Sequence, residues 1–262
     1  MLILCLSAGC SSTALHSEST IPDQPVISQT TPPESTIPET EVTTETFPTQ
    51  PATDSEHSEL YISGVCVEDV ILYFNEVCLD AEFVNSGNAS LLQKWITPIH
   101  YTLYGEYTAE DLAVLSSFTD WLNTIDGFPG IFMATTAEDA NLRIHFCSQS
   151  DMIDLMGDQF LEMDGAVTFW YSDDAIYDAV ICYRTDLDQH LRNSVILEEI
   201  YNGLGPIQDT ALRPDSIIYQ EFSETQQLSP MDALILQLLY HPNLLPGMDS
   251  YACETAIRSL YY

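Results

Sequence analysis

The stretch VILEEIYNGLGPIQD, residues 195–209, closes a long helical pattern that begins near Leu187. The pattern predicts a helix that ends at about Leu204. Gly205 follows directly, and glycine favours the left-handed conformation in which helices commonly stop. Neighbouring side chains on a helix point about 100° apart. The adjacent Glu198 and Glu199 therefore cannot face one substrate as a pair of carboxylates.

Helical and strand patterns alternate upstream of this stretch. Residues 65–80 and 107–124 predict helices, the second with Thr108 as its N-cap and acidic residues in its first turn. Residues 97–105 and 140–148 alternate apolar and polar side chains, which predicts half-buried strands. MIDLMGDQFLEM, residues 152–163, predicts a short helix or a loop.

A hairpin and a last helix complete the pattern. AVTFWYS and AIYDAVICYR predict two strands joined by a turn at Asp173 and Asp174. LSPMDALILQLLYHP predicts a helix with Ser229 as its N-cap and Pro230 at its first position, ended by Pro242. The order of elements predicts an α+β domain with a mixed sheet, over residues 58–262.

The residues before this domain have a different composition. Residues 11–57 are rich in Ser, Thr, Pro and Glu, which predicts a disordered linker that holds the domain away from a surface. Residues 1–10, MLILCLSAGC, resemble the end of a bacterial lipoprotein signal peptide, in which Cys10 becomes the lipidated residue. No Lys or Arg precedes the apolar run and Ser7 replaces the usual leucine, so we expect the true start to lie upstream. The alternative is a chance apolar start of a soluble protein.

The charge of the chain limits the classes of partner. With 40 acidic and 6 basic residues, the formal net charge is −34. Nothing in the chain could neutralise phosphates, so nucleic acid is excluded as a partner. An acidic surface is compatible with cationic ligands or loosely held calcium.

The cysteines of the domain do not predict a structural metal site. Their spacing contains no C-x-x-C pair. Cys66 and Cys78 fall in one predicted helix and would stand about 18 Å apart, which is beyond the reach of a disulfide. We expect mostly buried free thiols at Cys66, Cys78, Cys147, Cys182 and Cys253.

The opening stretch resembles the zinc-binding helix of metzincin proteases, H-E-x-x-H-x-x-G-x-x-H. Glu199 stands at the catalytic glutamate and Gly205 at the turn. Glu198, Asn202 and Gln208 replace the three zinc-binding histidines. The resemblance implies a zincin-like fold whose glutamate and glycine match and whose metal ligands differ.

Other segments extend this resemblance. RPDSIIYQ, residues 213–220, is similar to the metzincin Met-turn, with Ile218 in place of methionine. LSPMDALILQLLYH is similar to the last helix of these proteases, and LLQKWITPIHYTLYG is similar to their first strand.

A closer resemblance is to a family of bacterial, often lipid-anchored domains of unknown function, number 2927. That family has E-E-L-x-Q-x-L-G-L, then N-D, S-I and D-x-x-L-L-x-L-L-Y-x-P-x-L-x-P-G-M. The corresponding pieces here are EEIYNGLG, QD, SII and DALILQLLYHPNLLPGM, the last spanning residues 232–248. Asn202 replaces the usual glutamine. The resemblance covers about residues 65–250 and implies a degenerate zincin-like domain on a lipid anchor.

The substituted ligand positions argue against a zinc enzyme. Zinc prefers imidazole nitrogen or thiolate, whereas amide oxygens suit calcium better. His190 lies roughly 12 Å before Glu198 along the helix axis, and His241 lies at the far end of the last helix, so neither replaces a ligand. No Gly-x-Ser-x-Gly motif indicates a metal-free hydrolase. We expect Glu199 to persist as a structural acceptor for backbone amides of the SIIYQ segment or for Arg213.

Two further patterns have alternative interpretations. The aromatic run FWYSDDAIYDAVICY could line a sugar-binding surface, but alternating aromatics in strands favour a core. Asp173 and Asp174 could bind calcium, but a hairpin turn is the preferred interpretation.

These patterns lead to one functional hypothesis and one alternative. The hypothesis is a non-catalytic binding or structural module, lipid-anchored on the extracytoplasmic face of a bacterial membrane, with a peptide or glycan as its ligand. Under this hypothesis we expect no cofactor and no zinc, whereas the oxygen donors of the substituted ligand positions are compatible with calcium. The alternative is a divergent metal-dependent peptidase or hydrolase that uses Glu199.

Overall fold

The computed structural model describes residues 2–5, 60–79, 91–220 and 224–261. These residues belong to one compact unit. Cys10 and the predicted linker over residues 11–57 lie outside the described residues. None of the helices in the described ranges is long and apolar enough to cross a membrane.

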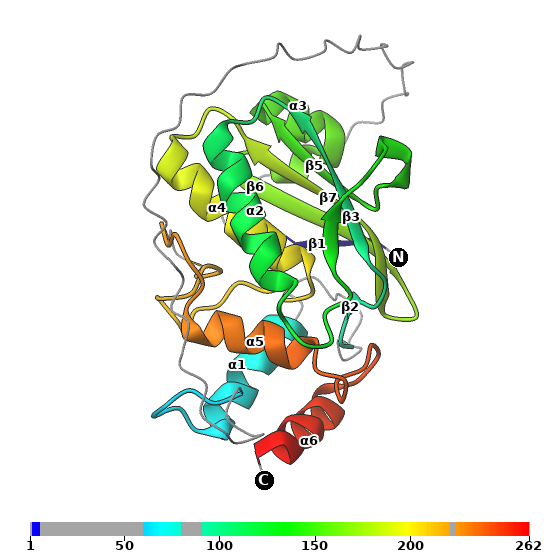
Figure 1. Ribbon diagram of the computed structural model, residues 1–262. Coiled ribbons are helices and arrows are strands. Elements are labelled where there is room, and N and C mark those ends of the chain that lie inside the picture. Colours follow the sequence, from blue (N-terminus) through cyan, green and yellow to red (C-terminus); the bar gives the residue numbers. More distant parts are fainter. Residues whose placement is uncertain (1, 6–59, 80–90, 221–223, 262) are drawn as a thin grey trace, which may run out of the picture. The chain divides into compact units, whose positions relative to one another are not determined.

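A mixed sheet lies at the centre of the unit (Figure 1). Its strands follow the order β1-β6-β7-β5-β3-β4, and β2 also pairs with β7. The pairs among β2, β3, β4, β5 and β7 are parallel, whereas β6 runs antiparallel to β7 and β1 antiparallel to β6. The predicted mixed sheet is therefore confirmed. The strands are β1 (Leu2–Cys5), β2 (Lys94–Trp95), β3 (Ile99–Gly105), β4 (Ile131–Met133), β5 (Leu142–Cys147), β6 (Gly165–Ser172) and β7 (Ala175–Arg184).

Six α-helices surround the sheet in the described part of the chain. In Figure 1, α2 and α4 lie side by side over one face of the sheet, while α1, α5 and α6 group together beyond it. The helices are α1 (Val67–Leu79), α2 (Ala109–Leu122), α3 (Gln149–Met156), α4 (Gln189–Gly203), α5 (Pro230–Leu239) and α6 (Ser250–Tyr261), with short 3-10 turns η1 (Ala137–Asp139) and η2 (Asp158–Phe160).

The local signals of the sequence place the helix starts and the hairpin correctly. The Thr108 side chain accepts a hydrogen bond from the backbone of Asp111, and Ser229 caps α5 with Pro230 at the first position. Asp173 and Asp174 adopt positive φ angles of 50° and 60°. Positive φ at both central residues is the geometry of a type I′ hairpin turn. These predictions are confirmed.

The two faces of the sheet bury different cores, because successive side chains of a strand point to opposite faces. Residues such as Ile144 and Ile181 join the main core beneath α2 and α4. On the other face, Ala166 and Cys182 pack with Met152 in a small second core. All five cysteines that the sequence assigns to the domain are free thiols, and three of them are buried.

Candidate functional site

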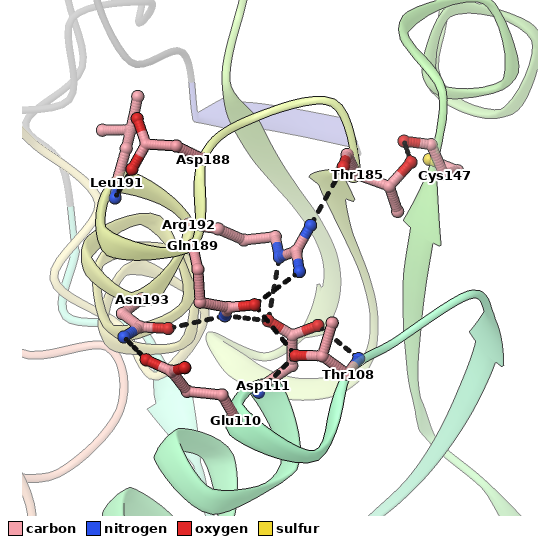
Figure 2. A network of polar contacts seen from close by, with 10 residues as sticks. All are labelled: Thr108, Glu110, Asp111, Cys147, Thr185, Asp188, Gln189, Leu191, Arg192 and Asn193. Carbon is pink, nitrogen blue, oxygen red and sulfur yellow. Dashed lines mark hydrogen bonds and ion pairs between the residues drawn. The ribbon is translucent and has the colours of Figure 1, made fainter.

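Helix α4 contains the predicted site residues Glu198, Glu199 and Asn202, and a buried polar network fixes its first turn (Figure 2). The Asp188 carboxylate accepts a hydrogen bond from the Leu191 backbone at 3.1 Å and so caps the helix. Arg192 is only 6% exposed. Its Nε atom donates to Oδ1 of Asp111 in α2 at 2.8 Å. This buried ion pair holds the starts of α2 and α4 together.

Gln189 completes the network. Its side-chain oxygen accepts from Arg192 Nη2 at 2.8 Å, and its side-chain nitrogen donates to Asp111 Oδ1 at 2.7 Å. Burial by itself would raise the pKa of Asp111. Hydrogen bonds from the Thr108 backbone, Gln189 and Arg192 outweigh that effect and bring the pKa below its usual range. The carboxylate is therefore charged and satisfied, which makes it a structural group.

The other end of α4 is fixed by β2 and by glycine. Gly205 has a φ of +136°, and a Cβ atom there would lie 2.5 Å from the backbone oxygen of Gln93. No side chain can be accommodated at that distance. Trp95 Nε1 donates to the Gly203 carbonyl at 2.9 Å and satisfies one of the last carbonyl groups of the helix. The predicted helix stop at Gly205 is confirmed.

The structure buries the residues at the catalytic and second ligand positions. Glu199 is 2% exposed and Asn202 is 3% exposed. Glu198 keeps part of its surface in contact with solvent. Gln208 lies in the loop after the helix, where its backbone N–H donates to Val77 O at 3.2 Å. Gly165 of β6 covers Glu199 so closely that a Cβ atom there would lie 2.8 Å from Glu199 Cγ.

Burial makes both glutamates of α4 difficult to ionise. It raises the pKa of Glu199 well above the usual range, and the neighbouring Glu198 and Asp209 raise it further. The pKa of Glu198 is raised well above its usual range by burial, then by Asp209 and Asp164. The helix thus holds two carboxyl groups that favour the protonated form.

This donor set does not fit zinc. Two of the three ligand positions offer amide oxygens, and the carboxyl at the third resists ionisation, whereas a metal ligand must be deprotonated. Among the described residues, no three His, Cys, Asp or Glu side chains converge as a metal-binding group. The Asn202 Oδ1 atom is buried and has no hydrogen-bond partner among them. An amide oxygen of this kind suits a hard cation better than zinc.

The sequence can now be placed among known families. A family model described as a protein of unknown function (DUF2927) matches residues 68–259. The chain belongs to this family. No curated protein matches the chain. The predicted resemblance to family 2927 is therefore confirmed.

In this DUF2927 domain, Asp232 holds the start of the SIIYQ segment. Asp232 is fully buried at the start of α5. It accepts hydrogen bonds from Ser216 Oγ at 2.7 Å, from the Ile217 backbone at 3.2 Å and from Tyr73 Oη at 3.2 Å. The carboxylate of Asp232 thus fixes the start of this segment, and the role of Glu199 as an acceptor for the rest of it stays a prediction.

The other partner predicted for Glu199, Arg213, has a carboxylate neighbour of its own. Arg213 pairs with Asp215, two residues away, at 2.9 Å. His190 is 59% exposed and lies 3.9 Å from Glu224. His241 uses Nδ1 to accept from the backbone two residues later. Each of these side chains has a local partner, and none is directed at Glu199.

The aromatic run of the DUF2927 domain is mainly core. Phe169 and Tyr183 are buried, and Tyr183 donates to the Ile196 carbonyl at 3.1 Å. Tyr177 is 52% exposed. A separate surface pocket of about 410 Å³ lies near the start of α1 and is lined by residues such as Cys66, and it contains none of the predicted site residues.

One group of chemically reactive side chains was not predicted as a site. Cys147 and Cys182 come from segments 35 residues apart and lie on the neighbouring strands β5 and β7. Alternation predicts both strands, but no local signal predicts that they pair. The sequence therefore predicts two separate free thiols, whereas the fold makes them neighbours.

Proposed function

We propose that this domain is a non-catalytic binding or structural module with a zincin-like scaffold, lipid-anchored through Cys10 on the extracytoplasmic face of a bacterial membrane. The order of elements supports the scaffold: a mixed sheet, then α4 ended by Gly205, then the Ser216–Ile218 segment fastened to α5. This is the order of landmarks that the metzincin resemblance implies.

The burial of Glu199 is the observation on which the non-catalytic proposal depends. A general base must come within hydrogen-bond distance of the group that it deprotonates. Glu199 is 2% exposed, and the backbone of β6 at Gly165 covers it. The position that would activate water in a metzincin is closed to solvent.

The edge of the sheet that is formed by β4 supports a binding role. Strand β4 ends the sheet, and its Phe132 and Met133 are 51% and 60% exposed. On the neighbouring strands, the rings of Tyr104 and His145 stack at 4.6 Å between centroids. The Asn123 side chain pairs with the backbone N–H and C=O of Ile131 in β4, so the exposed side chains and not the backbone edge support binding. Such side chains suit the face of a sugar or the side chains of a peptide. A peptide or glycan ligand is therefore proposed for this edge.

The alternative is a divergent hydrolase in which carboxylates and amides hold a metal. The unpaired oxygen of Asn202 favours it, because a buried acceptor without a partner costs free energy that a bound cation would recover. For this alternative, β6 would have to move away from α4 to admit substrate to Glu199.

Metal content and peptide cleavage separate these two functions. The purified full chain is dialysed against trace zinc and calcium, and bound metal is measured by mass spectrometry for the wild type and for Glu199→Ala, Asn202→Ala and Glu224→Ala. The exposed Glu224 serves as the matched control. We expect no stoichiometric metal and no cleavage of a peptide library in any of the four. Stoichiometric metal that is lost in Asn202→Ala, with cleavage that is lost in both Asn202→Ala and Glu199→Ala and kept in Glu224→Ala, would establish the hydrolase.

The lipid anchor requires its own test. In bacterial cells grown with labelled palmitate, the wild-type chain expressed from its full gene should incorporate label and fractionate with membranes. The Cys10→Ser variant should do neither. Labelling that persists in Cys10→Ser would refute the anchor without affecting the proposal for the domain.

A further inference from the structure

A sulfur-rich cluster lies on the face of the sheet opposite α2 and α4. It contains buried Met152, Phe160, Ala166 and Cys182, with Cys147, Met156, Met163 and Val180 packed against them. Five of these eight side chains carry sulfur, whereas the main core consists mostly of Leu, Ile, Val and aromatic residues. This concentration of one element calls for a chemical explanation beyond packing.

The two thiols of the cluster are neighbours. Cys147 ends β5 and Cys182 lies in β7, and these strands pair in parallel with His145 opposite Cys182. A hydrogen bond between the two thiol groups lowers the pKa of Cys147 and raises that of Cys182. Cys182 is fully buried, while Cys147 keeps part of its surface in solvent.

The geometry does not favour a disulfide between them. Cys147 lies two residues beyond the partner of Cys182 in the strand register. The Cα atoms of Cys147 and Cys182 are therefore separated by two residues along the strand direction and by one strand spacing across the sheet. Together these displacements place them roughly 8 Å apart. A disulfide cannot span more than about 7 Å between Cα atoms without backbone movement. The thiols are therefore available together as ligands.

The remaining ligands in reach are thioethers. Met152 and Met156 come from α3, and Met163 comes from the turn before β6. His145, although opposite Cys182, stacks on Tyr104 at 4.6 Å. No third His, Cys, Asp or Glu converges on the pair within the described ranges. Zinc and calcium do not use thioethers, whereas thiolate and thioether together select Cu(I).

We propose that Cys147, Cys182 and at least one of the surrounding methionines bind a soft monovalent cation, Cu(I). Binding replaces two S–H protons by two Cu–S bonds, so two protons are released and no electron is transferred. Cys147 and the partly exposed Met156 and Met163 provide the approach from solvent. The site lies on the other face of the sheet from Glu199, so it does not depend on the proposed function.

The test is an anaerobic Cu(I) titration of the reduced full chain in competition with bicinchoninate. A background variant with serine at Cys5, Cys10 and Cys66 removes three thiols that are not part of the proposed site. We expect one Cu(I) per chain in this background. Replacing Cys147 or Cys182 by serine should weaken binding by at least about 100-fold, with an affinity that falls as the pH is lowered. Retention of wild-type affinity in both serine variants would overturn the proposal.

Two further sets of variants keep the test decisive. Cys253→Ser removes a buried thiol from the main core and should leave Cu(I) binding unchanged. Equal loss of binding in Cys253→Ser would overturn the assignment of the site. If the circular dichroism spectrum shows that the cysteine variants do not fold, the test uses Met152→Leu, Met156→Leu and Met163→Leu instead. Leucine removes the thioether but has nearly the volume of methionine, so these variants should fold. We expect the triple leucine variant to bind at least about 10-fold more weakly. Unchanged affinity in that folded variant would refute thioether ligation.

Discussion

Lys94 is a buried cation whose ionisation should dominate the stability of the domain above neutral pH. It is 6% exposed, and its Nζ atom donates to the carbonyls of Leu239 and Leu244 near the end of α5. The same atom lies 5.6 Å from the ring centroid of Tyr240. No carboxylate pairs with it among the described residues. Burial lowers the pKa of Lys94 to about 8.

The size of this effect follows from the two pKa values. The ordinary value is 10.5, and a difference of one pKa unit corresponds to about 1.36 kcal/mol. Holding Lys94 charged in the folded protein therefore costs about 3 kcal/mol. Below pH 8 both states carry the proton and this cost is fully present. Between pH 8 and 10.5 the folded protein releases the proton while the unfolded chain keeps it, so the free energy of unfolding rises with pH.

Urea unfolding at several pH values measures this change. Unfolding of the wild type and of Lys94→Met is followed by tryptophan fluorescence at pH 7, 8, 9 and 10 with reductant present. We expect the free energy of unfolding of the wild type, relative to the variant, to rise by about 2.5 kcal/mol between pH 7 and 10. Tyr73 and Cys253, whose pKa values are raised by burial, oppose this rise above about pH 9. Tyr73 is present in both proteins, so the comparison cancels its effect. The charge of Lys94 lowers the pKa of Cys253, so both proteins are compared in a Cys253→Ser background.

An arginine variant provides the control. Arg stays charged over this range, so the stability difference between Lys94→Arg and Lys94→Met should not change with pH. A wild-type curve that runs parallel to the Lys94→Met curve would show that Lys94 has an ordinary pKa in the folded protein. That result would refute the burial argument.

Three other substitutions probe the helix that contains the predicted site. Arg192→Met leaves Asp111 charged and unpaired in the interior, and urea unfolding should show a loss of about 3–5 kcal/mol. Gly165→Ala places a methyl group 2.4 Å from Val195 Cγ1 and 2.8 Å from Glu199 Cγ, which should cost about 1–3 kcal/mol. That cost should be smaller in a Glu199→Ala background, and full additivity in the double-mutant cycle would contradict the contact. The wild type should lose stability as the pH rises above about 4.5, because the unfolded chain releases the Glu199 proton at a lower pH than the folded protein does. Glu199→Gln has no such proton, so its free energy of unfolding should fall less with rising pH. An unchanged pH profile in thermal denaturation would count against the raised pKa.

The sequence predicts those parts of the fold that local chemistry decides. Thr108 and Ser229 are N-caps because their side chains accept from backbone groups three residues later. The Asp173-Asp174 turn is predictable because two residues with positive φ join strands whose alternation is visible. In each case the interacting groups lie within a few residues of one another.

Elements that depend on distant partners are not predicted. Strand β2 has only two residues and is a strand because it pairs with β7. No local sequence pattern predicts this pairing. Lys94 in that strand would be expected on the surface, but the ends of α5 and of the following loop supply the carbonyls that hold it inside. The short strand β4 is defined in the same way by its pairing with β3.

The sequence predicted which helix contains the candidate residues, but not which parts of the fold would pack against them. The spacing of Glu198, Glu199 and Asn202 on one helix follows from the sequence alone. The burial of Glu199 depends on the close approach of Gly165, about 34 residues earlier in the chain. The pairing of Cys147 with Cys182 depends likewise on the order of strands in the sheet.

The residues that support the metzincin resemblance are explained by packing. Gly205 is required because the Gln93 backbone leaves no room for a side chain. Asp232 is required because it caps α5 and holds the Ser216–Ile217 turn. These matches describe a scaffold and need no catalytic chemistry. Glu199 is different, because burial raises its pKa well above the usual range, so an ionised Glu199 is a cost to the fold. The Glu199 variants are therefore the most informative about the function of this helix.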